Sequence, residues 1–291
     1  MNAASMENSG FEFSATYRNH DHPFKYDISA NLSTLRNRVT SLGFGTESYI
    51  TGAYATYVGK EIGKFYGWVY EGIARTQSDI DNHATQQGAN VGDCLYKDIS
   101  GPNGEPDGVI DAYDQTVLGS GLAKMNFGLS AHMEYKGFDL SISTYGALNY
   151  HVADDIYNSL NSCYGWGNKD VAMADANRFS EDGSTYLSNV PRTYATNNAT
   201  LAWNDLFSSR KIQNAAYWKI ANVELGYNFP DRWFKGLVSG VRAYVSAQNL
   251  YTFTGYKGYN VDYAGGTFTP GYNFCSFPSA RSFMAGLHFT F

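Results

Sequence analysis

The sequence has little charge and no long run of apolar residues. Only 16% of its 291 residues are charged, against about 25% in a typical soluble protein. No apolar stretch approaches the roughly 18 residues that a membrane-spanning helix requires, which excludes a helical membrane protein. Lys and Arg number 21 against 27 Asp and Glu, and the net charge of -6 comes with no basic stripe, so no nucleic-acid partner is expected.

Residue types that carry chemistry are also sparse. The three cysteines, Cys94, Cys163 and Cys275, form no CxxC pair and are too far apart for a disulfide framework. The six histidines have no metal-binding spacing, and neither HExxH nor GxSxG occurs, so we expect no catalytic residue and no enzymatic activity. The first ten residues, MNAASMENSG, lack the charged and apolar regions of an export signal. Either the protein stays inside the cell or its beginning is missing.

The main feature that is present is an alternation of apolar and polar side chains. In FKYDISANLS, residues 24–33, every second side chain is apolar, which is typical of a strand with two different faces. The Lys-Gly pair at 136–137 lies between two such segments and predicts a tight hairpin. We expect about eight or nine strands and no long helix. The expected strands lie at 11–17, 24–33, 65–74, 125–135, 138–144, 217–229, 241–251 and 279–291.

The last expected strand has large apolar side chains on one face up to the final residue. These are Phe283, Leu287, Phe289 and Phe291. Chain ends usually fray in water unless something holds them. Contact with lipid would stabilise this face, and a closed barrel leaves no strand edge unpaired in the membrane.

Short and long connections alternate between the expected strands. The links after residues 135 and 230 are short, whereas residues 75–123, 151–214 and 252–280 are far longer than usual connections. In an antiparallel meander, alternate links lie at the same end, so all the long loops fall on one side. This asymmetry is characteristic of outer-membrane barrels, which have short periplasmic turns and long extracellular loops.

Alternation alone does not separate a membrane barrel from a soluble β-sandwich, because a sandwich turns the same apolar face inward. The polar faces are rich in Ser, Asn, Gln and Tyr and poor in Lys, which suits a water-filled lumen. The alternating run at 221–229 spans about 20 Å of height at a strand tilt of about 40°, close to the apolar band of a barrel. Lys219 is expected on the same face, just beyond this band, where its long stem reaches the interface.

Six ordered stretches resemble one family, the SusC/RagA-like transporters, which are TonB-dependent outer-membrane importers of Bacteroidetes. The resemblance extends from about residue 9 to residue 291. The stretches are GKEIGKFYGWVYEGIA (59–74), GDCLYKDISGPNGEPDGVIDAYDQTVLGSG (92–121), NFGLSAHMEYKGFDLSISTYGALN (126–149), YWKIANVELGYNFP (217–230), VRAYVSAQNLYTFTGYKGYN (241–260) and FMAGLHFTF (283–291).

The resemblance implies an all-β, antiparallel transmembrane β-barrel of about 22 strands with a plug domain in its lumen. Residues 1–291 match only the C-terminal part of such a barrel, with 75–123 and 151–214 as long extracellular loops. The export signal, the plug and the first strands have no counterpart, so we expect a fragment. The implied location is the outer membrane of a Gram-negative bacterium.

The resemblance also implies partners. These are a SusD-like surface lipoprotein, TonB with ExbB and ExbD acting through the missing plug, outer-membrane lipid, and the barrel assembly machinery, which would read the terminal strand as its signal. The implied substrate is an oligosaccharide or, as a second choice, a peptide.

An acidic segment, DISGPNGEPDGVIDAYD at 98–114, resembles the family's Asp-x-Asn-Gly-Asp-Gly-x-Ile-Asp-x-x-Asp motif, itself similar to a calcium loop. Calcium binds several converging oxygens, and acidic residues around a glycine turn supply them. An inserted GPNGEP leaves the place of Asp98 open, and the alternative is a solvated acidic turn. A structural Ca²⁺ is the only cofactor considered. Its expected ligands are Asp98, Asp107, the Val109 carbonyl, Asp111 and Asp114, with Ile110 facing inward as an anchor.

Two other functions fit the same pattern. A self-contained small outer-membrane barrel would act as a pore or an adhesin, and a soluble β-sandwich would bind carbohydrate. Four loop aromatics are expected either to pack within the loops or to stack on a sugar: Tyr164, Trp166, Trp203 and Tyr272. Three tryptophans near strand ends are expected either in an interfacial belt or in ordinary packing: Trp68, Trp218 and Trp233.

Overall fold

The computed structural model describes residues 4–161, 168–171, 190–192, 203–234, 238–262, 265–274 and 276–291. Strands dominate these ranges, and the helices α1 (Gln77–Asp81) and α2 (Asp155–Leu160) are short. None of the described helices has the length and apolar character needed to cross a membrane. Four residues named above lie outside the described residues: Cys163, Tyr164, Trp166 and Cys275.

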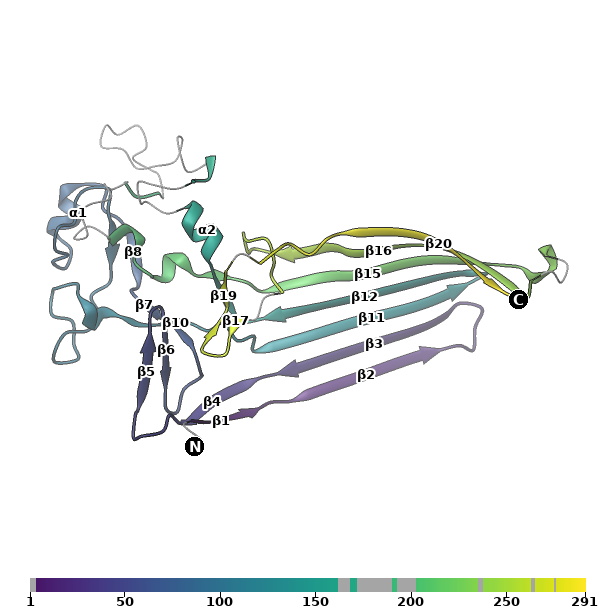
Figure 1. Cartoon of the computed structure of the whole chain (residues 1–291), viewed down its shortest axis with the longest axis horizontal. Coiled ribbons are helices and arrows are strands. Elements are labelled where there is room, and N and C mark those ends of the chain that lie inside the picture. The colour runs from purple at the N-terminus through teal and green to yellow at the C-terminus, as the bar shows by residue number, and fades with distance from the viewer. Residues whose placement is uncertain are drawn as a thin grey trace.

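Seven long strands form one antiparallel sheet, whose spatial order follows the chain (Figure 1). The strands are β2 (Glu12–Asn19), β3 (Lys25–Thr34), β11 (Met125–Tyr135), β12 (Phe138–Leu148), β15 (Tyr217–Phe229), β16 (Gly240–Thr254) and β20 (Ser282–Thr290). The predicted all-β, antiparallel architecture is therefore confirmed. The sheet has fewer strands than expected, because residues 65–74 form β7 (Lys64–Gly67) and β8 (Tyr70–Ile73) in small separate sheets.

The two ends of this sheet differ. Short connections join the strands at the end that carries the C-terminus, and we call it the turn end. The long connections gather at the opposite end, the loop end, as Figure 1 shows. The turn-end connections are 20–24, 136–137 and 230–239, and the loop-end connections are 35–124, 149–216 and 255–281. The described residues of 75–123 and 151–214 thus belong to the loop end.

The loop end is a folded body with its own buried clusters. Phe65 is fully buried against Tyr54 and Ala153, and Tyr96 is buried against Cys94 and Ile110. Short strands build this body: β1 (Ser5–Ser9), β4 (Arg36–Ser41), β5 (Ser48–Thr51), β6 (Tyr54–Tyr57), β9 (Cys94–Tyr96), β10 (Thr116–Gly119), β13 (His151–Asp154), β14 (Gln213–Asn214), β17 (Gly265–Gly266), β18 (Thr269–Pro270) and β19 (Tyr272–Asn273). The 3₁₀ turns of this body include Ala112–Asp114 and Ser209–Lys211, and another, Asp231–Trp233, lies in the turn-end connection after β15.

The register of the seven strands places apolar residues beside apolar residues. Ala30 lies between Ala15 of β2 and Leu129 of β11. We call this side the outer face and the opposite side the inner face. The outer face comprises the odd-numbered residues of β2, β11, β16 and β20, the even-numbered residues of β3 and β12, and residues 218, 220, 223, 225, 227 and 229 of β15. None of these positions is charged.

A β-bulge in β15 changes which side Lys219 faces. The register shifts between Ile220 and Asn222 against both neighbouring strands, so Ala221 is an extra residue. On the N-terminal side of this bulge, Ile220 faces outward and Lys219 faces inward. The Lys219 side is covered by protein, and the residue is only 4% exposed. The expectation that Lys219 reaches the membrane interface is wrong, because it assumed an unbroken strand with a strict period of two.

The predicted hairpin between β11 and β12 is confirmed. Lys136 and Gly137 both have positive φ, 49° and 88°. Two consecutive residues of this kind match the right-handed twist of the paired strands. Gly137 has a further reason to be glycine, since a Cβ there would lie 2.9 Å from the Asn228 carbonyl oxygen.

An ion network ties β12, β15 and β16 together on the inner face near the turn end. Arg242 donates from Nε to Asp139 Oδ2 at 3.0 Å and from Nη2 to Asp139 Oδ1 at 2.5 Å. Its Nη2 also donates to Glu224 Oε1 at 2.7 Å. A Cβ at Gly226 would lie 2.4 Å from the guanidinium, so only glycine leaves room for the network.

Replacing Arg242 is expected to destabilise the protein. Asp139 is 5% exposed, and Arg242→Gln leaves its carboxylate without its bidentate partner. We expect a loss of about 2 kcal/mol in the free energy of unfolding, measured by urea titration. The matched control is Arg18→Gln, because the Arg18 side chain is 73% exposed and lies 3.6 Å from Asp27. The control is expected to cost less than about 1 kcal/mol, and equal losses would contradict the prediction.

Candidate functional site

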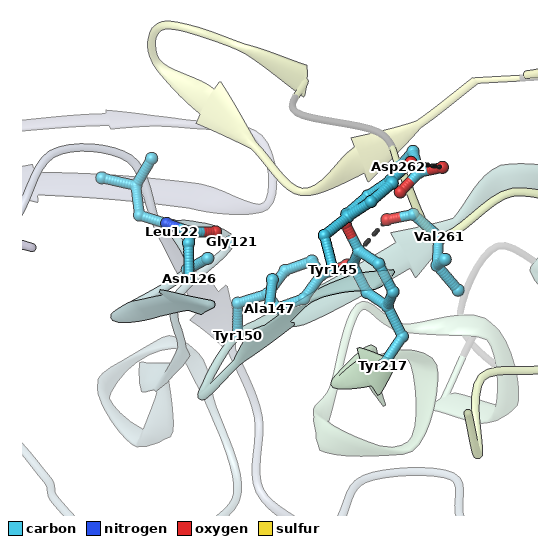
Figure 2. A pocket seen from close by; sticks show the side chains of 10 residues that line it. Gly121, Leu122, Asn126, Tyr145, Ala147, Tyr150, Tyr217, Val261 and Asp262 are labelled. Carbon is cyan, nitrogen blue, oxygen red and sulfur yellow. Dashed lines mark hydrogen bonds between the residues drawn. The ribbon is translucent and has the colours of Figure 1, made fainter. Parts of the chain in front are cut away.

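The inner face has a cavity of 390 Å³ where β11, β12 and β15 reach the loop end (Figure 2). Three tyrosines form its wall. The Tyr145 and Tyr217 rings are 6.1 Å apart and nearly perpendicular at 84°, and the Tyr150 and Tyr217 rings are 6.5 Å apart at 74°. Figure 2 shows Leu122 and Gly121 across from them. We call this cavity the tyrosine pocket.

The strand register builds the tyrosine pocket. Tyr145 and Ala147 are inner-face residues of β12, and Ala147 pairs with Tyr217, the first residue of β15. Tyr150 follows β12 and is held by its hydroxyl, which donates to the Val261 carbonyl at 2.7 Å. The pocket therefore joins the sheet to the connection at 255–281.

A second cavity of 390 Å³ continues from the tyrosine pocket along the inner face. The two cavities share Asn126, Tyr145 and Tyr217 in their walls. The second is lined further along by polar side chains such as Asn31 and Ser143. A polar track thus leads from the tyrosine pocket down the inner face.

Among the described residues that line the tyrosine pocket, the one carboxylate, that of Asp262, is neutralised by a lysine. Lys219 Nζ lies 2.5 Å from Asp262 Oδ2 and 5.7 Å from the centre of the Tyr145 ring. The Tyr145 hydroxyl also donates to Asp262 Oδ2 at 3.2 Å. The wall thus offers ring faces, hydroxyls and the Asn126 amide, with its carboxylate already paired. This arrangement suits binding of an uncharged, hydroxyl- or amide-rich ligand.

A buried carboxylate fixes the connections around the pocket. Asp154 is 3% exposed and accepts hydrogen bonds from the Tyr256 hydroxyl, from Asn273 Nδ2 at 3.0 Å and from the Tyr157 amide at 2.7 Å. These donors come from the connection after β16, from β19 and from α2. The loop that contributes Val261 is therefore held to the body of the loop end.

The acidic segment 98–114 is closed by its own hydrogen bonds. Asp114, fully buried, accepts from the amides of Ile99 at 2.8 Å, Ser100 at 3.2 Å and Asp111 at 2.8 Å. Ile110 is 3% exposed and packs in a cluster with Cys94 and Tyr96, as expected of an anchor.

The other predicted metal ligands in this segment also bond to the backbone. Asp111 accepts from the Tyr113 amide at 2.7 Å, and Asp107 from the Val109 amide at 3.0 Å. Asp98 Oδ2 accepts from Gly108 at 2.7 Å, whereas Asp98 Oδ1 is buried without a hydrogen-bond partner. No group of three or more His, Cys, Asp or Glu side chains in the described ranges has metal-binding geometry.

The four terminal residues named from the sequence lie together on the outer face of β20 or directly after it. Phe283, Leu287, Phe289 and Phe291 are 71%, 64%, 49% and 93% exposed. Their role as an assembly signal stays a prediction. Trp218 and Trp233 are exposed near the ends of β15, whereas Trp68 lies in the loop end and donates to the Asp111 carbonyl at 3.0 Å.

The sequence pattern did not predict the tyrosine pocket. The aromatics expected to contact a ligand lie in the loops, but Trp203 donates to the Gln87 carbonyl at 2.8 Å and Tyr272 bonds to Asp155 at 3.1 Å, both within the loop end. One feature of the sequence does indicate the pocket. Tyr145 falls on the polar side of the alternation in β12, where a large aromatic ring has no lipid or core to contact.

The tyrosines around the pocket predict a loss of stability at high pH. Burial, together with the charge of Asp262, raises the pKa of Tyr150, and burial together with the hydrogen bond to Asp154 raises the pKa of Tyr256. Unfolded tyrosines ionise near pH 10, so the stability from these groups is complete below about pH 10 and is lost as pH rises towards the folded pKa.

Urea unfolding between about pH 9 and pH 12 measures this loss. In the alkaline part of that range, the unfolding free energy of the unmodified protein falls as pH rises. In Tyr150→Phe this slope is expected to be shallower by up to about 1.4 kcal/mol per pH unit, the value for one proton. An unchanged slope in Tyr150→Phe would contradict the prediction.

The chain is similar in sequence to several known proteins. No family model matches the sequence. The chain is 28% identical to TonB-dependent receptor P3 of Formosa agariphila and 26% identical to TonB-dependent receptor SusC of Bacteroides thetaiotaomicron, over 100% of its own length in both cases. It covers 29% and 27% of those proteins, and so spans less than a third of the curated relatives that it matches.

The fold has a match among solved structures. A chain of the RagAB peptide transporter superimposes with a TM-score of 0.78, covering 100% of this chain and 30% of that chain at 22% identity. The chain is therefore similar over its whole length to TonB-dependent receptors, SusC among them, and this confirms the family resemblance seen in the sequence motifs.

Proposed function

We propose that the chain is the C-terminal part of the barrel of an outer-membrane, TonB-dependent importer of oligosaccharides or other large nutrients. The observation that carries this proposal is the uncharged outer face. Phe13, Leu225, Val245 and Leu287 lie on four different strands and are 62%, 46%, 54% and 64% exposed. A continuous apolar surface of this kind is costly in water and matches the hydrocarbon of a bilayer.

Aromatic side chains flank the apolar band at both ends. Near the loop end, Trp218 and Phe253 stack at 5.3 Å. Near the turn end, Phe138 and Tyr227 lie 4.6 Å apart. Trp218 and Tyr227 are eight paired positions apart once the bulged Ala221 is left out, about 27 Å along the strand and about 20 Å of height at a tilt of 40°. This separation supports an apolar band between two interfacial belts.

The edges of the sheet support a larger barrel. β2 and β20 each pair with one neighbour in the seven-stranded sheet. An unpaired strand edge is not tolerated in hydrocarbon, because each bare amide or carbonyl group costs several kcal/mol. We propose that further strands close the sheet into a barrel of about 22 strands with a plug inside it, as in the transporters that the chain resembles. A small self-contained barrel is less well supported, because β2 and β20 do not pair.

The inner face supports a transport role. The tyrosine pocket lies where the strands meet the loop end and continues into the polar track. In our proposal a nutrient is gripped between the loop end and a SusD-like lipoprotein on the outside. It is released inward when TonB, with ExbB and ExbD, pulls the plug. The relatives are receptors and transporters, so the proposed activity is import without bond-breaking chemistry.

The orientation of the two faces can be tested with spin labels on the protein in lipid vesicles. Labels introduced by Leu225→Cys and Leu287→Cys on the outer face are expected to relax through lipid-soluble oxygen. Labels at Ser130→Cys and His288→Cys are the matched controls on the inner face of the sheet, and they are expected to relax through a water-soluble reagent. The reverse pattern, or a protein that folds as a monomer without detergent, would establish the soluble sandwich and overturn the proposal.

We also propose a structural Ca²⁺ in the acidic segment, with Asp98, Asp107, the Val109 carbonyl, Asp111 and Asp114 as ligands. Its main support is the partnerless Asp98 Oδ1, since a buried carboxylate oxygen is costly unless something neutralises it. The backbone hydrogen bonds of Asp111 and Asp114 leave further lone pairs available. When bound, the ion would hold a long connection together and would have no catalytic role.

A calcium titration of the folded protein tests this site. Millimolar Ca²⁺ is expected to raise the melting temperature, because a ligand that binds only the folded state stabilises it. Asp98→Asn is expected to abolish the increase, and Asp81→Asn, in the exposed helix α1, is the control that preserves it. An unchanged melting temperature in the unmodified protein would remove the calcium proposal and leave the import proposal intact.

A further inference from the structure

The outer face continues beyond the apolar band on the strand pair nearest the N-terminus. β1 and β4 pair in the same register as β2 and β3, from Glu12 opposite Ser33 to Ser9 opposite Arg36. The two pairs belong to separate sheets, and one backbone bond links them, since the Thr34 amide donates to the Phe11 carbonyl at 2.9 Å while the Phe11 amide donates to Thr34 Oγ1. Figure 1 shows β4 continuing β3 towards the loop end.

This continuous register fixes which way the arginines of β4 face. The outward positions of β3 are Ala30, Leu32 and Thr34, so the next outward positions are Arg36 and Arg38. Along this side of the strand, from the apolar band towards the loop end, they are the first charged side chains. Both are exposed.

The other side of β4 is covered by protein. Val39 is 2% and Asn37 9% exposed, and Asn37 Oδ1 accepts a hydrogen bond from the Ile62 amide at 2.9 Å. The two arginines therefore lie on the free side of a strand whose opposite side is packed. Within the described part of the chain, no carboxylate lies within ion-pair distance of either guanidinium, including Glu7, which is opposite Arg38 in the register.

Their height places the arginines at the level of lipid head groups. Arg36 is four residues beyond Leu32, about 13 Å along the strand and about 10 Å further from the membrane centre at a tilt of 40°. Phe11, 84% exposed, lies on the same face of the neighbouring strand. It is opposite Thr34, and so two residues nearer the apolar band than Arg36, which is opposite Ser9. An aromatic ring followed by cations is the sequence of groups that a lipid head-group region accommodates.

We propose that Arg36 and Arg38 bind the phosphate groups of a phosphorylated glycolipid of the lipid A type in the outer leaflet. This inference rests on the proposed function, which places the loop end outside the cell. Guanidinium groups form two parallel hydrogen bonds to a phosphate, and arginine is less strongly hydrated than lysine. The two arginines are about 7 Å apart along the strand, so one head group with two phosphates can contact both.

Binding of purified lipid A to the detergent-solubilised protein tests this proposal. At low ionic strength, the double variant Arg36→Gln, Arg38→Gln is expected to bind lipid A about 30-fold more weakly than the unmodified protein. The matched control is Arg232→Gln, an exposed arginine in the turn-end connection, which is expected to leave the affinity unchanged. Lipid A stripped of its phosphates is expected to bind the unmodified protein as weakly as intact lipid A binds the double variant.

Each outcome decides between this site and the proposed function. Equal lipid A binding by the double variant and the unmodified protein would overturn the site, provided that both proteins are folded. An equal, arginine-dependent affinity for phosphatidylglycerol would overturn the assignment to a glycolipid. A protein that folds without detergent and binds neither lipid would instead overturn the proposed function.

Discussion

The hydrogen-bonded register between neighbouring strands is the constraint on which this structure depends. Successive side chains of a strand point to opposite sides, so pairing one strand with the next decides which residues share a face. Here the register brings Leu140, Leu225 and Val245 side by side on three strands. The same pairing sends Asp139, Glu224 and Arg242 to the inner side, where Arg242 donates hydrogen bonds to both carboxylates. One set of backbone bonds thus separates apolar from charged side chains across the whole sheet.

The loop end obeys a different rule, because its connections are too long for the sheet to hold them. Buried polar groups fix them instead. Asp93 accepts two hydrogen bonds from Arg192, at 2.7 and 2.9 Å, across 99 residues of sequence, and Asp154 gathers donors from three segments. The contacts of Asp154 also position a wall of the tyrosine pocket, since Val261 and Asp262 belong to the same connection as Tyr256, which the sheet alone does not position.

The sequence predicted the strands and their faces well, because both depend on local alternation. Residues 24–33 and 125–135 needed only a period of two, and Lys136 and Gly137 needed only the chemistry of a tight turn. The bulge at Ala221 could not be predicted, since alanine fits either face and an extra residue leaves no mark in composition. Neither could the pocket, whose Tyr145 and Tyr217 are brought together by pairing between strands far apart in the sequence.

The single extra residue at Ala221 has a consequence for how chains of this type diverge. Deleting Ala221 would leave Lys219 on the inner face, because the strand would then alternate without a break. Adding or removing one residue in a regular stretch of a long strand would instead exchange the two sides of everything beyond that point. Insertions and deletions within the sheet are therefore tolerated only where a bulge absorbs them, whereas the loop end is free to grow or shrink. Relatives of this chain should differ in length almost entirely outside the seven strands.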